Sequence, residues 1–370
     1  MKYKLAYLSF FIALSIHAQK IQIGSYTFKD GSVYSGDLQG NKPHGKGITQ
    51  FKNGDKYEGE YVKGKRQGEG TYSFIDGEKY EGSWLQDQQH GRGTFYFMNN
   101  NRYEGLWYRD YQQGIGTMYY YNGDIYYGNW FQDKRHGKGK YTYCNGATYE
   151  GMWKDDKKSG EGTFKWPDGS IYKGFWSNNL RNGKGTFKYA DGDKYIGEWL
   201  NDIQHGQGIY YFKNGDVYEG QYVQGERTGN GVFKFANGNK YIGSFKNGEQ
   251  NGEGTYIWKS GAQYQGQWVN NQHEGHGKYT WANGDVYEGS WKAGKMHGTG
   301  ILRQVNGNKY KGSFSNGLKD GNNAIEENAD GIRFEGSYKQ GHRNGPFVEK
   351  DKNGNIIAKG SYNMDVRNEK

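Results

Sequence analysis

Aromatic and glycine residues recur along this chain with a fixed period. Tyrosines stand 23 residues apart from Tyr34 to Tyr310, and each is followed two positions later by glycine. Two positions further on stands a large side chain, which is often tryptophan, as at Trp84. A period this regular indicates a repeat protein, and its internal spacing does not fit a helix.

Within each repeat the large side chains alternate with other residues, which predicts short β-strands. Tyr80 and Trp84 are separated by an even number of positions, so they lie on one face of a strand. A hairpin loop of three residues, with Gly77 in the left-handed conformation, pairs Tyr72 with Tyr80. A loop of two residues would put these rings on opposite faces. We therefore expect the three-residue loop, with every ring on one face and polar residues on the other.

Glycines and turn-forming residues complete the repeat. A glycine between two rings on the same face leaves room for them to lie flat, and Gly70 opposite Gly82 allows the sheet to coil strongly. Another slot holds glycine, aspartate or asparagine, which tolerate a positive φ and so predict a second turn. Its members include Gly64, Asp87, Asp110, Asp133, Asp156, Asn179 and Asp202.

The repeated motif resembles a known family. Tyr57 to Trp84 reads YEGEYVKGKRQGEGTYSFIDGEKYEGSW, which is similar to the MORN repeat (membrane occupation and recognition nexus). The likeness runs from about Tyr26 to Phe314, and the segment from Asn344 resembles the divergent variety common in bacteria. The resemblance implies an all-β fold, an open, elongated, twisted array of β-hairpins with about 14 repeats of 23 residues. It implies no catalytic residues within the repeats.

The first residues differ from the rest. Lys2 and Lys4 precede an apolar run of 12 residues from Leu5 to Ile16, and Ala18 is a plausible cleavage point. This layout is typical of a secretory signal peptide, because a membrane-spanning helix needs about 20 apolar residues. We predict a secreted or periplasmic protein, with peripheral membrane attachment left open. The predicted divisions are a signal peptide (1–18), a partial repeat or cap (19–33), the repeat array (34–333) and divergent repeats with a cap (334–370).

Composition and charge exclude several classes of function. The net charge is +9, but Lys and Arg are interleaved with Asp and Glu, so we expect no nucleic-acid partner. Cys144 is the only cysteine, which excludes an intramolecular disulfide and a cysteine-based zinc site. The Gly-x-Gly motifs do not lead into a helix, so phosphate binding is not predicted.

The histidines are the candidate catalytic or metal-binding residues of this sequence. Five share one polar loop slot: His44, His90, His136, His205 and His297. Histidines that lie two repeats apart, such as His44 and His90, are separated by four strands, or about 19 Å, and this distance is too long for them to share a metal ion. The cluster HEGH at His273 to His276 lies in a loop and is a poor metal site. We expect no catalytic, cofactor or metal site.

These observations favour a non-enzymatic scaffold of the cell envelope. The expected partner is another protein, or a second copy in an end-to-end homodimer. Two alternatives are binding of phospholipid headgroups and binding of carbohydrate through exposed aromatic rows. The candidate partner-binding residues are Trp84, Trp107, Trp130, Trp153, Trp176, Trp199, Trp268 and Trp291. Whether these rings are buried or line an open groove decides between a core role, which we favour, and a binding role.

Overall fold

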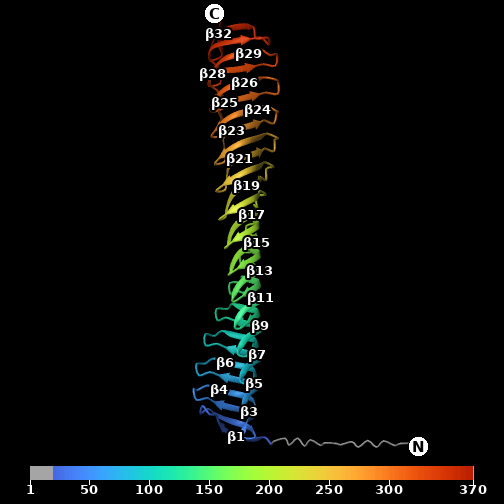
Figure 1. The fold of residues 1–370 in the computed structure, drawn as a ribbon, viewed down its shortest axis with the longest axis vertical. Coiled ribbons are helices and arrows are strands. Elements are labelled where there is room, and N and C mark those ends of the chain that lie inside the picture. The colour runs from blue at the N-terminus through green and yellow to red at the C-terminus, as the bar shows by residue number, and fades with distance from the viewer. Residues whose placement is uncertain (1–19, 370) are drawn as a thin grey trace, which may run out of the picture. The chain divides into compact units, whose positions relative to one another are not determined.

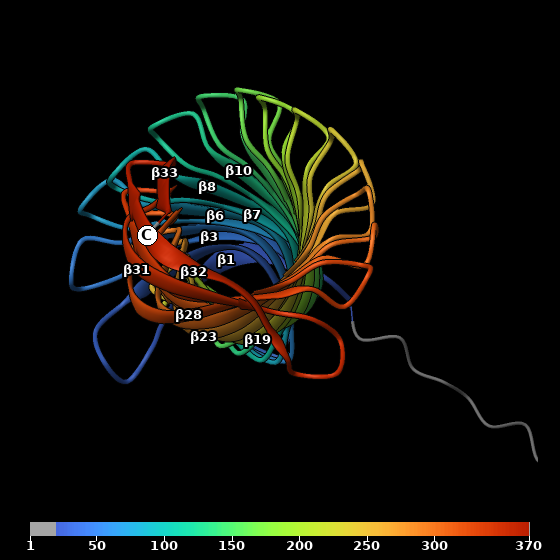
Figure 2. The ribbon, with the colours of Figure 1, turned by 90° about the horizontal axis from the view of Figure 1, so that it is seen from above.

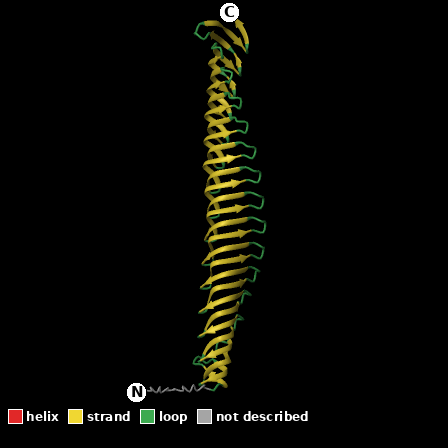
Figure 3. Cartoon of the chain, turned by 90° about the vertical axis from the view of Figure 1, so that its right-hand side faces the viewer, coloured by secondary structure: helices red, strands yellow, loops and turns green. Residues whose placement is uncertain are grey.

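The computed structural model describes residues 20–369, which form strands and turns without any helix (Figure 3). Within these residues there is accordingly no helix of the length and apolarity needed to cross a bilayer. The predicted signal peptide, residues 1–18, lies outside the described residues. The chain divides after Lys158 into two compact units. Strands follow one another in chain order within each unit (Figure 1).

The first unit is built from antiparallel strands of alternating seven and nine residues after β1. They are β1 (Gln22–Thr27), β2 (Val33–Gln39), β3 (Lys42–Gln50), β4 (Lys56–Val62), β5 (Lys65–Ser73), β6 (Lys79–Leu85), β7 (Gln88–Tyr96), β8 (Arg102–Tyr108), β9 (Tyr111–Tyr119), β10 (Ile125–Phe131), β11 (Lys134–Thr142) and β12 (Thr148–Lys154).

The second unit begins within β13 and repeats the same alternation as far as β26. Its strands are β13 (Lys157–Lys165), β14 (Ile171–Ser177), β15 (Leu180–Lys188), β16 (Lys194–Leu200), β17 (Ile203–Tyr211), β18 (Val217–Val223), β19 (Glu226–Lys234), β20 (Lys240–Lys246), β21 (Glu249–Ile257), β22 (Gln263–Val269), β23 (Gln272–Thr280), β24 (Val286–Lys292), β25 (Lys295–Arg303), β26 (Lys309–Ser315), β27 (Leu318–Lys319), β28 (Gly321–Glu327), β29 (Arg333–Lys339), β30 (His342–Arg343), β31 (Gly345–Lys350), β32 (Ile356–Asn363) and β33 (Val366–Glu369).

The predicted three-residue hairpin loop is confirmed. Tyr72 on β5 faces Tyr80 on β6. The amide of Phe74 donates to the carbonyl of Glu78 at 3.0 Å, which closes a loop of three residues. Gly77 in this loop has φ 95°, the left-handed region that glycine tolerates without strain. All rings of the hairpin therefore lie on one face.

The second turn is also confirmed, but it is followed by a bulge that we did not predict. Gln86 and Asp87 have φ 51° and 72°, the pattern of a two-residue turn between β6 and β7. Trp84 pairs with Gln89, and Gly82 pairs with Gly93. Between these two pairs, β7 therefore has two more residues than β6. An even number of extra residues keeps each ring on its face. Bulges increase the local twist, and Figure 2 shows strand directions turning progressively along the first unit, coloured blue to teal.

The core of each unit is a single layer of rings lying on glycines. Tyr80 is fully buried and packs edge-to-face on Trp84 and Trp107 at 5.2 and 5.3 Å between ring centroids. Its hydroxyl donates to a carbonyl of its own strand, so the polar end is satisfied. A Cβ at Gly93 would overlap the Tyr80 ring, and one at Gly82 would overlap the backbone of Gly93. The predicted role of glycine in making room for the rings is confirmed.

The repeat becomes irregular near the C-terminus of the second unit. The strand after β26 is split into β27 and β28, and its register shifts between Gly321 and Ala324. Here Glu326 accepts hydrogen bonds from Lys319 at 2.6 Å, Arg343 at 2.8 Å and Tyr338 at 2.5 Å. Burial alone would raise the pKa of Glu326, but these partners lower it to about 2. A network of charged residues thus helps to hold these strands together, as ring packing does in the regular repeats.

Candidate functional site

The eight tryptophans named as candidate partner-binding residues lie in the core. Their exposed fractions are between 4% and 7%. Trp130, for example, packs edge-to-face on Tyr103 and Tyr126, and its indole N–H donates to the carbonyl of Gly116 at 3.2 Å. A sheet with no second layer on its aromatic face must bury these rings against one another. The structure therefore corrects the candidate list, because buried rings offer no face on which a ligand could stack.

Long polar side chains that we did not single out cover this core. The Arg66 guanidinium lies 4.2 Å from the centroid of the Trp84 ring and 5.2 Å from that of Tyr72. It donates to the carbonyl of Asp87 at 2.8 Å and lies within 3.4 Å of its carboxylate. The arrangement recurs at Arg135 with Asp156 and at Arg181 with Asp202. A spacing of 21 residues between Arg and Asp was the available signal. We call this position, Arg66 and its equivalents, the ring-covering slot.

His273 occupies the ring-covering slot of its repeat. Its ring stacks on Tyr264 at 3.7 Å and meets Trp268 and Trp291 edge-on. Burial lowers the pKa of His273 to about 4, so the imidazole is neutral at pH 7. His276 instead pairs with Ser290, on the polar face. The HEGH residues lie within β23 and not in the expected loop, and their side chains diverge. The five histidines that share one slot likewise lie within strands and not in loops. The described residues hold no cluster of three or more metal-ligating side chains.

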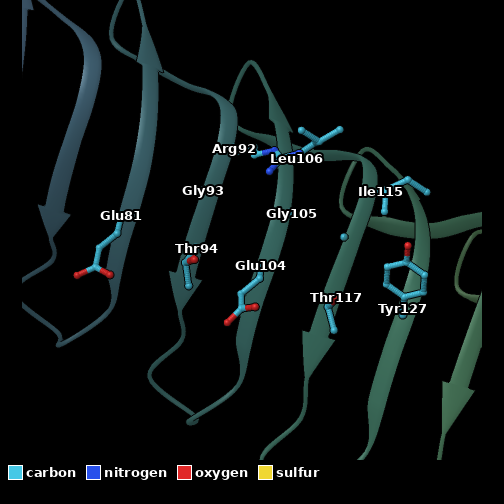
Figure 4. Close-up of a pocket in the computed structure, with 11 residues that line it drawn as sticks. Glu81, Arg92, Gly93, Thr94, Glu104, Gly105, Leu106, Ile115, Thr117 and Tyr127 are labelled. Atoms are coloured by element: carbon cyan, nitrogen blue, oxygen red, sulfur yellow. The ribbon is translucent and has the colours of Figure 1, made fainter.

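The face opposite the rings is open, and in the first unit it forms a groove. A cavity of about 540 Å³ lies over the glycines of β7, β8 and β9, among them Gly93, Gly105 and Gly116. Figure 4 shows Glu81, Thr94, Glu104, Thr117 and Tyr127 on consecutive strands, with Arg92, Leu106 and Ile115 beside them. We call this the polar-face groove.

Three apolar side chains lie together in this groove, although apolar residues such as Phe175 and Ile196 also lie on the polar face of other repeats. Leu106, Ile115 and Tyr127 are 39%, 43% and 57% exposed. One repeat earlier, the equivalent positions hold Ser83, Arg92 and Glu104. Exposed rings and aliphatic chains at positions that are otherwise polar are typical of interaction surfaces. Sequence reasoning missed them because it expected only polar residues on this face, although the departures from the period are visible in the sequence.

Charged residues frame the apolar part of the groove. Lys79 Nζ lies 2.7 Å from Glu81 Oε1, and Arg102 Nε lies 2.9 Å from Glu104 Oε1. Glu81 and Glu104 are both partly exposed, so they can accept further hydrogen bonds from a ligand. Arg92 lines the same cavity and is exposed. The groove therefore offers acceptors, a donor and an apolar centre.

The repeat is that of an established family. The MORN repeat model matches thirteen consecutive segments that together span residues 34–322. The chain belongs to the MORN repeat family. This membership indicates a repeat-based protein-interaction or membrane-binding scaffold. The match ends where the strands of the second unit become irregular.

Comparison with other known proteins adds little. No curated protein matches the chain. The TCP10 domain of Danio rerio CPAP in complex with a peptide of STIL is 13% identical, with a TM-score of 0.27 over 60% of this MORN protein and 88% of that domain. The SAS-4 TCP domain of Drosophila melanogaster in complex with a proline-rich motif of Ana2 is 15% identical, with a TM-score of 0.28 over 48% and 90%. TM-scores this low support no argument.

Proposed function

We propose that this MORN protein is a non-enzymatic scaffold of the cell envelope that binds a polypeptide partner in the polar-face groove. The observation that carries the proposal is the apolar centre of Leu106, Ile115 and Tyr127, exposed between ion-paired carboxylates. The aromatic face supports the same choice, because its tryptophans are used for the core. The envelope location rests on the predicted signal peptide.

The chemistry of the groove suits a peptide better than a membrane surface. A membrane with anionic headgroups favours a basic surface, whereas Glu81 and Glu104 line this cavity. A partner side chain that is apolar can pack on Tyr127, and a neighbouring Lys or Arg can bond to Glu104. Burial of a central aromatic residue with a polar rim is the usual basis of affinity at protein interfaces.

The absence of catalysis is part of the proposal. Glu81 and Glu104 are each ion-paired with a cation two residues earlier on their own strand. In this proposal both carboxylates act in recognition, as acceptors of hydrogen bonds from a partner.

The repeat itself supplies variants that test the groove without disturbing the fold. Leu106→Ser, Ile115→Arg and Tyr127→Glu install the residues found at these slots one repeat earlier, so the combined variant should fold. Phe175→Ser makes the same kind of change at the slot of Leu106 in the second unit, where Phe175 is 45% exposed, and serves as the control.

Photo-crosslinking measures binding directly. A photoreactive residue at position 94, inside the groove, should crosslink to a polypeptide in cells, and another at the exposed turn position 122 should not. The triple variant should lose the crosslink and the Phe175→Ser variant should keep it. Retention in the triple variant, or crosslinking to lipid alone, would overturn the proposal. Amino-terminal sequencing of the exported protein should start at Gln19 and tests the location separately.

A further inference from the structure

The first repeat of the array departs from the others on the aromatic face. Its ring-covering slot holds Pro43, where later repeats hold Arg66 or Gln89. Opposite Tyr34 stands Thr49, where the next repeat places Tyr72 opposite Tyr57. Both replacements remove volume at the same place, because ring and slot side chain lie against each other elsewhere in the array.

These two replacements leave a hollow lined by rings. The cavity has a volume of about 460 Å³ and is bounded by Tyr26, Phe28, Phe51 and Tyr61. Tyr26 and Phe28 meet edge-on at 5.1 Å, while the Tyr61 hydroxyl and Thr49 Oγ1 share a hydrogen bond of 2.6 Å. We call this hollow the first-repeat pocket. Its size and aromatic lining are those of sites for small molecules.

The rim of the first-repeat pocket is positively charged. Lys42, Lys63 and Lys65 line it and are all exposed. Throughout the described chain, none of the three ammonium groups has an ion-pair partner. Arg66 is different, because Asp87 holds it through its carbonyl and carboxylate. Asp30 also lines the pocket and accepts a hydrogen bond from the amide of Ser32 at 3.0 Å, so the three lysines outnumber one carboxylate and the rim keeps an excess of positive charge.

A cationic ligand would not suit this pocket. Elsewhere the adjoining turn holds the guanidinium that lies over the rings: Asp87 binds Arg66 through its carboxylate and carbonyl, whereas Gly248 binds Arg227 through its carbonyl alone. In the first repeat the equivalent turn position is Gly64, which has no carboxylate. Three lysines would also repel a cation and attract an anion.

We propose that the first-repeat pocket binds a small anion with a ring-shaped body. The ring packs on Tyr26, Phe28 and Phe51, and a carboxylate or phosphate on the ring bonds to the lysines of the rim. This site lies on the face opposite the polar-face groove and does not depend on it. An acidic sugar and an aromatic acid share this chemistry.

Titration calorimetry on the full chain tests the pocket, with glucuronate and benzoate as the charged probes and glucose and benzyl alcohol as their neutral counterparts. We expect at least one anion to bind and its neutral counterpart to bind at least tenfold more weakly. Pro43→Gln restores the slot residue of later repeats, fills the pocket and should weaken binding at least tenfold. The anion that binds identifies the source as sugar or aromatic acid.

A second set of variants keeps the test valid if Pro43→Gln disturbs the strand. Lys63 and Lys65 both lie on the exposed rim of the pocket. Lys63→Asp and Lys65→Glu install the residues that other repeats have at these two positions, namely Asp155 and Glu226. Together they should also weaken binding at least tenfold. Lys138→Glu reverses a lysine on the opposite face and should leave binding unchanged. Binding of neither anion, equal binding of the neutral probes, or unchanged binding in the rim variant would overturn the proposal.

Discussion

Acidification should loosen the repeat around His273 by a predictable amount. The His273 ring is buried against Tyr264, Trp268 and Trp291, and burial lowers its pKa from 6.5 to about 4. In the unfolded chain the imidazole takes up a proton as the pH falls below about 6.5, while the folded repeat resists protonation until about pH 4. The contribution to stability is therefore full above pH 6.5 and lost as the pH falls to about 4.

The size of the effect follows from the two pKa values. A difference of one pKa unit is worth about 1.4 kcal/mol, so the shift of His273 predicts a loss of about 3 kcal/mol between pH 7 and pH 4. Carboxylates titrate in the same range, so a variant must isolate the histidine. His273→Gln does so, because Gln89 and Gln250 occupy the same slot in other repeats.

Hydrogen exchange measures this locally. The opening free energy of β22–β24 should fall by about 3 kcal/mol more in the natural protein than in His273→Gln between pH 7 and pH 4. The strands β4–β6, whose slot holds Arg66, provide the internal reference and should respond equally in both proteins. Identical pH dependence of β22–β24 in the two proteins would refute the reasoning that His273 is buried in its neutral form.

Three further predictions follow from the packing. Glu326→Gln should cost about 3 kcal/mol in local stability, since Lys319 and Arg343 would lose the carboxylate nearest to them. The pKa of about 2 means that this stabilisation is present above pH 4.5 and is lost as the pH falls towards 2, as acid titration of unfolding would show. Gly93→Ala should disrupt its hairpin far more than Gly64→Asn in thermal unfolding, because its Cβ overlaps the Tyr80 ring whereas Gly64 is a turn position with open space. Deletion of the 23 residues 195–217 should leave a folded array one hairpin shorter, whereas deletion of 20 residues, 195–214, should expose the rings, as near-ultraviolet circular dichroism would show.

Each of these has a contradicting result. Unchanged acid sensitivity in Glu326→Gln would mean that the network around this carboxylate is not stabilising. Equal melting temperatures for Gly93→Ala and Gly64→Asn would mean that the ring does not lie on the glycines. Equal loss of near-ultraviolet signal in the two deletions would mean that the repeats are not modular.

The strands could be predicted from the sequence because the period of two is repeated in every unit of 23 residues. The three-residue loop followed from the need to put Tyr72 and Tyr80 on one face, and the structure confirms that pairing. The bulge after the second turn was not predictable in this way. It adds an even number of residues, so the faces are the same with or without it.

The candidate site was harder to predict, since periodicity shows what every repeat shares. Tryptophans are shared, and the structure places them in the core. The residues that distinguish the polar-face groove and the first-repeat pocket, such as Tyr127 and Pro43, are departures from the repeat. Their effect depends on which strands lie beside them, and the register across the bulge, given by the structure, decides that.

Hydroxyl-radical footprinting of the natural protein, alone and with its crosslinked partner, tests most directly the claim that one face is core and the other binds. Tyr127 should be oxidised in the free protein and protected by the partner, while Trp107 and Trp130 should react little in either state, since they are 6% and 4% exposed. Strong oxidation of Trp107 and Trp130 in the free protein, with protection by the partner and none at Tyr127, would contradict the account and make the aromatic face the binding surface.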